Sequence, residues 1–152
     1  MQKVLFICHG NICRSPMAEM VMKDIVRKQG LQDMFYIASA ATSTEEIGSN
    51  VHYGTRNKLA QMGVPCEDRR AVQITKADYD KYDYLLIMDE RNERNLARII
   101  KEDPENKIYK LLDFTERKGE AIADPWYTGD FDTTYRDIVE GCEGLLAFLL
   151  EK

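Results

Sequence analysis

Short, uninterrupted apolar runs alternate with longer amphipathic segments along the chain. An apolar run without alternation predicts a strand that is buried on both faces, as in a parallel sheet. Apolar positions with helical spacing, bounded by capping residues before and by glycine or proline after, predict helices. We expect strands at residues 3–7, 35–39, 84–88 and 107–112, and helices at 16–30, 55–62, 89–102 and 132–150, with a short helical turn near 75–78.

The alternation of strands and helices predicts an α/β domain with a four-stranded parallel sheet and helices on both faces. The chain of 152 residues has neither an internal repeat nor a linker-like segment, so residues 1–152 are expected to form a single domain. Ligands in such sheets bind beyond the carboxyl ends of the strands. The turn between the first strand and the first helix is therefore the first place to look for a site.

That turn carries a cysteine and an arginine in the pattern C-x5-R-S, which runs from Cys8 to Ser15. A loop that leads into a helix points its backbone N–H groups inward and forms a cradle for an anion. Gly10 permits close approach of the backbone, and Asn11 tolerates a left-handed conformation. The same dipoles favour the thiolate form of Cys8, and Arg14 has the planar fork that grips two phosphate oxygens. We also expect Ser15 to cap the helix and to donate a hydrogen bond to the Cys8 sulfur.

A cysteine at the end of a buried strand is often only a small apolar residue, so Cys8 alone would indicate little. Its place in the full pattern, after a strand and before the helix that starts near Pro16, favours a catalytic thiol. The loop lacks the Gly-Lys-Ser/Thr sequence of a nucleotide-binding loop, and the four cysteines form no CxxC pair. We therefore expect a reaction on the thiolate without metal or other cofactor, no structural disulfides, and Cys142 in the core.

A phosphate ester needs a proton on its leaving oxygen, and three residues are candidates for the donor. His9 is expected to point away from the centre of the loop or to shape its rim, and His52 to be a solvent-exposed residue of a polar loop. Asp124 is the better candidate, although Asp-Pro by itself also forms turns. The large aromatic residues Trp126 and Tyr127 follow directly, and as a wall beside the acid they would suit an aryl phosphate.

Two segments of the sequence resemble the signatures of the low-molecular-weight protein tyrosine phosphatase family. They are V-L-F-I-C-H-G-N-I-C-R-S-P near the N-terminus and D-P-W-Y about 110 residues later. The similarity extends over essentially the whole chain, including residues 39–43, residues 88–92 and the C-terminal helix. It implies that Cys8 attacks phosphorus to form a phosphocysteine, that Arg14 and the loop amides stabilise the transferred group, and that Asp124 protonates the leaving phenolate and then activates water.

The resemblance also implies supporting roles. Cys13 matches a second loop cysteine that can form a reversible disulfide with the nucleophile under oxidation, and Tyr127 matches a site of phosphorylation. Ser15 would assist the leaving thiolate, and Asn11 would hold the loop through a network that includes Ser39. The residues implied in or behind the phosphate-binding loop are His9, Gly10, Asn11, Ile12, Cys13, Ser15 and Ser39, and those implied at the substrate pocket are Glu45, Trp126 and Tyr127.

The sequence departs from eukaryotic members of that family at Glu45, where an aromatic residue often lines the pocket entrance. A carboxylate there should weaken stacking and repel acidic peptides, as in a microbial member, unless the loop is simply solvated.

A protein arginine phosphatase is an alternative, although those relatives tend to have threonine in place of Ile12 and a more polar environment after the acid. An arsenate reductase is a second, but residues 85–96 lack the further cysteines that it needs. A non-catalytic phosphate-binding module is a third, which the presence of Cys8 and Asp124 disfavours.

Composition and charge narrow the range of partners. Hydrophobic residues make up 44% and charged residues 31% of a chain that has a net charge of −5 and no basic stripe. Such a chain is a poor candidate for binding nucleic acid or an anionic membrane surface. The apolar run at the N-terminus is too short for a signal peptide or a membrane span. We therefore expect a cytoplasmic monomer whose partners are phosphotyrosine-containing proteins or peptides.

Overall fold

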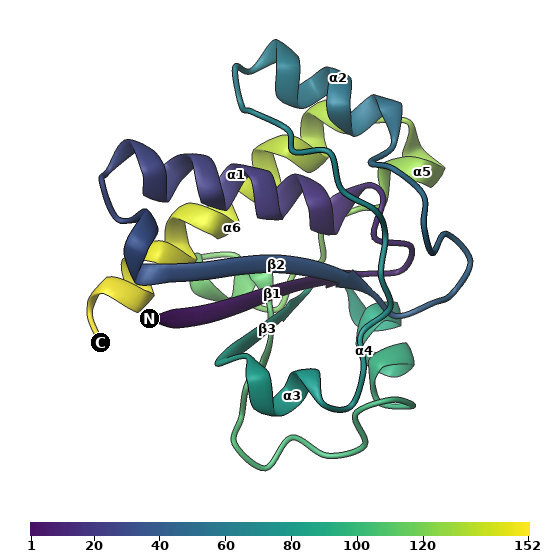
Figure 1. The fold of residues 1–152 in the computed structure, drawn as a ribbon, viewed down its shortest axis with the longest axis vertical. Helices are drawn as coiled ribbons and strands as arrows, with labels where there is room; N and C mark the ends of the chain where they lie inside the picture. Colours follow the sequence, from purple (N-terminus) through teal and green to yellow (C-terminus); the bar gives the residue numbers. More distant parts are fainter.

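The computed structural model describes all 152 residues and contains one sheet of four parallel strands (Figure 1). The strands are β1 (Gln2–Cys8), β2 (Phe35–Ala41), β3 (Tyr84–Ile87) and β4 (Ile108–Lys110). Their order in the sheet is β2-β1-β3-β4, and the register pairs Cys8 at the end of β1 with Ala41 at the end of β2. The predicted α/β class with a four-stranded parallel sheet is confirmed.

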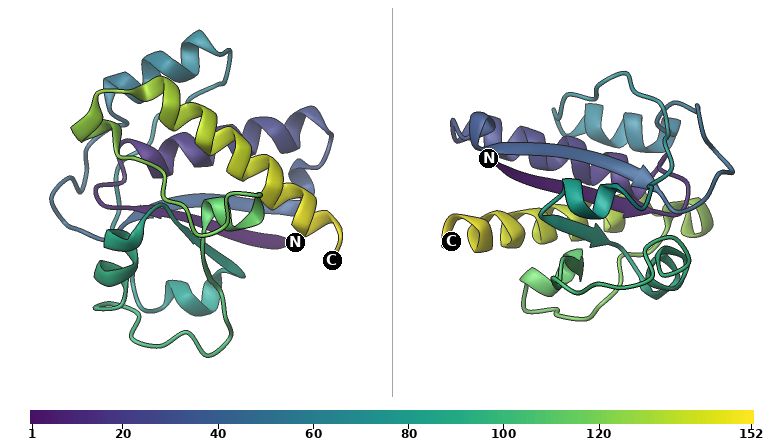
Figure 2. Two further views of the ribbon diagram at one scale, coloured as in Figure 1. Left: turned by 180° about the vertical axis from the view of Figure 1, so that it is seen from behind. Right: turned by 60° about the horizontal axis from the view of Figure 1, so that its bottom comes forward.

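Six helices divide between the two faces of the sheet. They are α1 (Arg14–Lys28), α2 (Tyr53–Gln61), α3 (Asp78–Lys81), α4 (Glu90–Leu96), α5 (Pro125–Thr128) and α6 (Phe131–Leu150), with 3-10 turns η1 (Gln32–Met34) and η2 (Leu111–Phe114). Helices α1 and α6 lie against one face with α2 beyond them, and the shorter α3 and α4 lie on the opposite face (Figures 1 and 2). None of the helices combines the length and the apolar character needed to cross a membrane.

Strand β1 is apolar without interruption because helices cover the sheet on both sides. Val4 and Phe6 belong to the large cluster formed with α1 and α6, whereas Leu5 and Ile7 pack with residues of α3 and α4. Successive side chains of a strand point to opposite faces, so each of these pairs meets a different helical layer. The position of β1 at the centre of the fold follows from this pattern.

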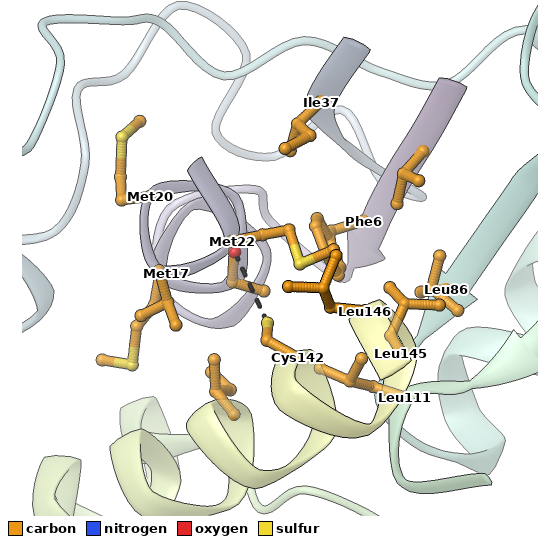
Figure 3. Close-up of a cluster of buried hydrophobic side chains, with 14 of the residues drawn as sticks. Phe6, Met17, Met20, Met22, Ile37, Leu86, Leu111, Cys142, Leu145 and Leu146 are labelled. Carbon is orange, nitrogen blue, oxygen red and sulfur yellow. Dashed lines mark hydrogen bonds between the residues drawn. The ribbon is translucent and has the colours of Figure 1, made fainter. Parts of the chain in front are cut away.

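The core between α1 and α6 includes Cys142, as the sequence predicts (Figure 3). Its side chain is completely buried, and its thiol donates to the Ala18 carbonyl oxygen at 3.8 Å. Burial raises the pKa of this thiol well above its ordinary value. Cys142 is therefore an inert core residue, because the thiolate is the reactive form of cysteine.

Two elements are shorter than the sequence predicts by more than one residue. Helix α4 ends at Leu96 rather than at residue 102, because the chain turns there and Ile100 packs into the same apolar cluster as Leu96. The loop that follows is held by the Asp103 carboxylate, which accepts a hydrogen bond from the Lys107 N–H at 2.7 Å. Strand β4 ends at Lys110 rather than at residue 112, because the next turn, η2, buries its two leucines against α6.

The strand order reverses at β1. From β1 the chain crosses one face of the sheet through α1 to β2, and from β3 it crosses the opposite face through α4 to β4. The loops that leave the carboxyl ends of β1 and β3 therefore diverge, which opens a crevice between them. Cys8 ends β1 and Asp89 comes directly before α4, so both residues lie at this crevice.

Gly144 in α6 offers a test of the packing. Alanine exceeds glycine in helix propensity by about 1 kcal/mol, so propensity alone predicts that Gly144→Ala stabilises the protein. A Cβ at this position would lie 2.3 Å from the Phe114 carbonyl oxygen, which is backbone and cannot rotate away. We expect Gly144→Ala to lower the free energy of unfolding, measured in urea, by about 1–3 kcal/mol. The exposed Glu143→Ala should change it by less than about 0.5 kcal/mol, and a stabilised Gly144→Ala would contradict the packing.

Candidate active site

The loop between β1 and α1 owes its shape to Asn11. This residue has a φ of 58°, in the left-handed region that asparagine adopts more readily than most residues. Gly10 has no positive φ, and a Cβ there would make ordinary contact with the Glu46 side chain at 3.5 Å. The left-handed position of the loop is therefore Asn11, and glycine is not required next to it.

Buried hydrogen bonds hold Asn11 in this conformation. Its side-chain amide donates to the hydroxyl oxygens of Ser15 at 2.8 Å and Ser39 at 3.0 Å. Its amide oxygen accepts from the Val72 N–H at 3.1 Å. The loop is thereby tied to α1, to β2 and to the segment before α3. A strained backbone persists only where its surroundings over-determine it, and this network meets that condition.

Two charged residues support this network, and the sequence reasoning missed both. Glu19 of α1 is buried and accepts a hydrogen bond from the Ser39 hydroxyl. It also pairs with Lys23 (Nζ–Oε2, 2.7 Å) and with Arg69 (Nε–Oε1, 3.6 Å). Arg69 in turn donates to the backbone carbonyl oxygen of Asn11 at 3.2 Å and to its side-chain oxygen. The signal in the sequence that could have identified Glu19 was a carboxylate on the buried face of an amphipathic helix.

Ser15 faces the Cys8 sulfur instead of capping the helix. Its Oγ lies 3.0 Å from Cys8 Sγ, and its backbone N–H donates to the same sulfur at 3.4 Å. Helix α1 begins at Arg14, with Cys13 in the N-cap position and no side-chain cap, so the predicted capping role of Ser15 is wrong. The Ser15 hydroxyl forms hydrogen bonds with Cys8 and Asn11 and does not cap the helix.

The two cysteines of the loop differ in their surroundings. Both are buried and line the same cavity, but the hydroxyl and the N–H of Ser15 face only Cys8. Burial, together with the charges of Cys8 and Asp124, raises the pKa of Cys13 to about 12. The Cys13 thiol therefore stays protonated at neutral pH. Of the two thiols, Cys8 is the one whose sulfur the Ser15 hydroxyl and N–H face.

Arg14 is buried between two carboxylates from distant parts of the chain. Its Nη1 donates to Asp89 Oδ2 at 2.6 Å and to the Ile122 carbonyl oxygen at 2.8 Å. Its Nη2 lies 3.4 Å from Asp124 Oδ2. Only 3% of the Arg14 side chain is exposed. The loop after β1, the turn after β3 and the segment before α5 therefore meet at one guanidinium group.

Asp89 is a site residue that sequence reasoning did not find. Its Oδ1 accepts the Asn92 N–H at 2.8 Å, so this residue caps α4 while it binds Arg14. Burial works to raise the pKa of Asp89, but the charge and hydrogen bond of Arg14, with two backbone N–H groups, outweigh burial and hold the pKa below its usual value. An aspartate after a buried strand and before a helix was the signal that could have identified it.

Asp124 is positioned by α5, a single helical turn within a segment expected to be a loop. Its Oδ1 accepts the Trp126 N–H at 3.0 Å and caps this turn, and Pro125 is buried at the first helical position. Its Oδ2 faces Arg14. Trp126 and Tyr127 of the same turn are 58% and 69% exposed and line the cavity. The turn therefore sets the acid beside the arginine and the aromatic residues at the opening.

These residues surround one cavity of about 190 Å³. Three of the predicted residues, Asn11, Ser15 and Ser39, do not line the cavity, because their side chains form the buried hydrogen bonds that support the loop. Two lining residues, Glu46 and Arg91, were not predicted. The predicted residues that line the cavity are Cys8, His9, Gly10, Ile12, Cys13, Arg14, Glu45, Asp124, Trp126 and Tyr127.

The two histidines lie toward the rim of the cavity. His9 Nε2 contacts the Glu45 carboxylate, which agrees with the expectation that His9 shapes the rim. His52 is partly buried, with its ring edge-on to Trp126 at a centroid distance of 5.5 Å, and its Nδ1 accepts the Gly54 N–H at 3.0 Å. Burial and a neighbouring arginine lower the pKa of His52. The prediction that His52 is a free, solvent-exposed residue is therefore wrong.

Comparison with known sequences connects this geometry to a family. A sequence profile described as "Low molecular weight phosphotyrosine protein phosphatase" matches residues 3–152. The chain belongs to the low-molecular-weight phosphotyrosine protein phosphatase family. The low molecular weight protein-tyrosine-phosphatase YfkJ of Bacillus subtilis is 38% identical over 148 residues, which are 97% of this chain and 95% of that protein. The low molecular weight phosphotyrosine protein phosphatase of Homo sapiens is 39% identical over 149 residues, 95% of this chain and 94% of that protein.

Solved structures of such phosphatases share the fold. The crystal structure of YfkJ has a TM-score of 0.93 at 38% identity and covers 99% of this chain and 96% of its own. The structure of DARP, a Drosophila arginine phosphatase, has a TM-score of 0.86 at 33% identity, with coverages of 97% and 98%. The expectation that the chain is an enzyme of the protein-tyrosine-phosphatase class is confirmed, because the family and the two relatives are described as phosphatases of this class.

Asp89→Asn tests the ion pair at the centre of the site. Asparagine still caps α4, so the change removes only the charge that faces Arg14. We expect the free energy of unfolding at neutral pH to fall by about 1–3 kcal/mol, because a largely buried guanidinium group loses a charged partner.

The effect of this substitution should depend on pH. The native pKa of Asp89 lies below its usual value of 3.8, so the pair stabilises the protein above that pH and its contribution is lost as the pH falls through the native pKa. In denaturant titrations, the difference between wild type and Asp89→Asn should therefore shrink below a pH of about 4. A difference that is the same at neutral and acidic pH would contradict the ion pair.

Proposed function

We propose that this phosphatase hydrolyses phosphotyrosine in proteins or peptides through a phosphocysteine intermediate on Cys8. The observation that carries the proposal is a single cavity lined by a thiol, a guanidinium group and a carboxylate. Arg14 and Asp124 are in contact at its wall, with 3.4 Å between Nη2 and Oδ2. A nucleophile, a phosphate clamp and a proton donor therefore share one small space.

In the first step, the Cys8 thiolate attacks phosphorus, an S–P bond forms and the bond from phosphorus to the tyrosine oxygen breaks. Asp124 gives its proton to the leaving phenolate oxygen, so the product departs as neutral tyrosine. Arg14 and the backbone N–H groups of the loop stabilise the charge on the transferred phosphoryl oxygens.

In the second step, water attacks the phosphocysteine, and the S–P bond breaks. Asp124 is now ionised and accepts a proton from the attacking water. The Ser15 hydroxyl, whose oxygen lies 3.0 Å from the sulfur, donates to Cys8 as it leaves as a thiolate. Inorganic phosphate is released, and the scheme uses no metal or other cofactor because Arg14 and the loop supply the electrostatic stabilisation.

The depth of the nucleophile limits the substrates that can reach it. Cys8 is only 3% exposed, whereas Trp126 and Tyr127 are exposed side chains of the same cavity. A long side chain such as phosphotyrosine carries its phosphorus past such a rim, while phosphoserine holds phosphorus close to its own backbone. The aryl ring would contact Ile12 and Trp126. We therefore propose phosphotyrosine-containing proteins as substrates of a cytoplasmic, monomeric enzyme.

Two regulatory roles belong to the same proposal. A peroxide would oxidise the Cys8 thiolate to a sulfenic acid as its O–O bond breaks, and the Cys13 sulfur would then displace hydroxide, released as water, to form a Cys8–Cys13 disulfide that blocks the nucleophile until a thiol reduces it. Phosphorylation of Tyr127 would act on an exposed side chain at the cavity. The raised pKa of Cys13 keeps it a thiol at neutral pH, so its attack on an oxidised Cys8 would be slow.

Phosphoarginine is a second candidate substrate. The similarity to the Drosophila arginine phosphatase supports it, and Glu45 and Glu46 bring carboxylates to the cavity, where a guanidinium group would find partners. Ile12, in place of the threonine expected in arginine phosphatases, and Trp126 favour an aryl substrate. Phosphotyrosine therefore remains the first candidate.

The proposed function is tested by steady-state hydrolysis of a phosphotyrosine peptide and of a phosphoarginine substrate, with chelator present. We expect turnover of phosphotyrosine that persists in chelator and is abolished in Cys8→Ser, because serine is a far weaker nucleophile here. Ile12→Thr should shift the ratio of the two kcat/KM values toward phosphoarginine. A wild-type preference for phosphoarginine would overturn phosphotyrosine as the proposed substrate but leave the proposed phosphocysteine mechanism in place. Failure to turn over either substrate would favour the two remaining alternatives, an arsenate reductase and a non-catalytic phosphate-binding module.

The role of Asp124 is tested with aryl phosphates that differ in leaving group. Asp124→Asn can still cap α5 but has no proton to give, so it separates catalysis from the shape of the turn. We expect kcat/KM, which contains the first step but not the hydrolysis shared by all substrates, to fall by about 10²–10⁴-fold for phenyl phosphate, whose leaving oxygen needs the proton. Activated esters such as p-nitrophenyl phosphate should be slowed much less. Equal slowing of both substrates would contradict the general-acid role.

A further inference from the structure

We propose that Arg91 forms a second anion-binding subsite, which holds a carboxylate or phosphate group of the substrate polypeptide next to the phosphotyrosine. The inference rests on the proposed function and narrows the substrate that the enzyme prefers. Arg91 of α4 lines the cavity together with Arg14, and the two guanidinium groups have opposite environments. Arg14 is buried and paired with two carboxylates, whereas Arg91 is exposed and has no salt bridge.

The Arg91 guanidinium group has most of its hydrogen-bonding capacity unused. Its hydrogen bond to a protein side chain is from Nη1 to the Tyr127 hydroxyl oxygen, at 3.3 Å. A guanidinium group has five N–H donors in a planar fork that fits carboxylate and phosphate oxygens in pairs. An incoming anion would therefore find free donors without having to displace a competing carboxylate.

The position of Arg91 is fixed relative to the phosphate site. Asp89, two residues earlier, both binds Arg14 and caps α4, so the backbone that carries Arg91 is tied to the buried guanidinium group. The contact with Tyr127 leads to α5, the turn that Asp124 caps. The backbone from which Arg91 extends is therefore held next to the phosphate site, within reach of a residue that neighbours the phosphotyrosine in sequence.

The remaining charged residues of the rim lie on a different segment. Glu45 and Glu46 belong to the loop after β2, where Glu45 contacts His9 and the Glu46 carboxylate accepts the Ser49 hydroxyl at 3.2 Å. The expected repulsion of acidic peptides is therefore centred on that side of the rim. The hydrogen bond to the tyrosine hydroxyl of α5 raises the pKa of Arg91, and the charge of Glu45 adds to this effect, but Glu45 forms no salt bridge with Arg91, and the α4 side is attractive to an anion. The net charge of −5 disfavours anions at long range, so an acidic preference would have to arise at Arg91 itself.

The test compares kcat/KM for phosphotyrosine peptides that are identical except for flanking glutamate, glutamine, phosphoserine or lysine. The variants are Arg91→Gln, Arg91→Glu and, as a matched control, Arg94→Gln, which alters an exposed arginine of α4 that does not line the cavity. For wild type we expect the glutamate peptide to exceed the glutamine peptide by about three- to fivefold, the size of one exposed ion pair. The phosphoserine peptide should exceed it further, because its charge is larger.

The ratio between peptides, rather than the absolute rate, decides the outcome. The glutamate-to-glutamine ratio should fall to about one in Arg91→Gln and keep its wild-type value in Arg94→Gln. In Arg91→Glu, the glutamate peptide should become a poorer substrate than the glutamine peptide, and the lysine peptide a better one. A preference for phosphoserine alone would identify phosphate as the ligand of the subsite. An equal loss of the preference in Arg94→Gln, or a wild type that prefers neither the glutamate nor the phosphoserine peptide, would overturn the proposal.

A small aryl phosphate without flanking residues separates this proposal from the one on which it rests. If wild type hydrolyses the aryl phosphate but shows no preference among the peptides, the Arg91 subsite is wrong and the phosphatase activity stands. If the aryl phosphate and the peptides are all inert, both the activity and the subsite are overturned. Weakening of the glutamate preference at high salt would support an ion pair, and a preference that salt does not change would contradict it.

Discussion

Burial of the Arg14 guanidinium group is the constraint on which the rest of the site depends. A charge with 3% of its side chain exposed must be balanced inside the protein, and Asp89, Asp124 and the Ile122 carbonyl oxygen supply that balance. These partners follow β3 or precede α5, so Arg14 is satisfied only when the sheet is assembled and both segments are in place. The same contacts that stabilise the fold at this edge of the sheet therefore bring Asp124 to the loop that carries Cys8.

The two carboxylates are unequal partners of Arg14. Asp89 holds it at 2.6 Å and is itself fixed as the cap of α4, whereas Asp124 lies 3.4 Å away on a single helical turn. A phosphate group that enters the cavity competes for guanidinium N–H donors, and the longer contact is the one that yields. In the proposed mechanism, Asp89 keeps Arg14 oriented throughout, while Asp124 is released toward the leaving oxygen when phosphate is bound.

Residues whose signal is local could be predicted from the sequence, and residues defined by a distant partner could not. The apolar runs that alternate with amphipathic segments, the C-x5-R-S loop and Asp-Pro each carry their meaning within contiguous residues, so the fold class, the loop and Asp124 follow from them. Glu45 was predicted only from the resemblance to the family. Glu19, Arg69, Asp89 and Arg91 are charged residues, and such residues usually indicate a solvated surface. Only the folded chain brings their partners within reach. The prediction of Ser15 as the N-cap was wrong for the same reason, because in the folded chain the Ser15 hydroxyl contacts the Cys8 sulfur and the Asn11 amide instead.

The rim and the walls of the cavity act on different parts of a substrate. At the rim, Glu45 and Glu46 attract a cationic group and Arg91 repels it, so the charges that line the same cavity oppose one another. They cannot by themselves separate phosphoarginine from phosphotyrosine. The apolar walls at Ile12 and Trp126 can, because contact with a flat ring is favourable for an aryl group and offers no hydrogen bonds to a guanidinium group. In the proposed function, the walls therefore select the phosphorylated residue, and in the proposed subsite the rim charges select its neighbours.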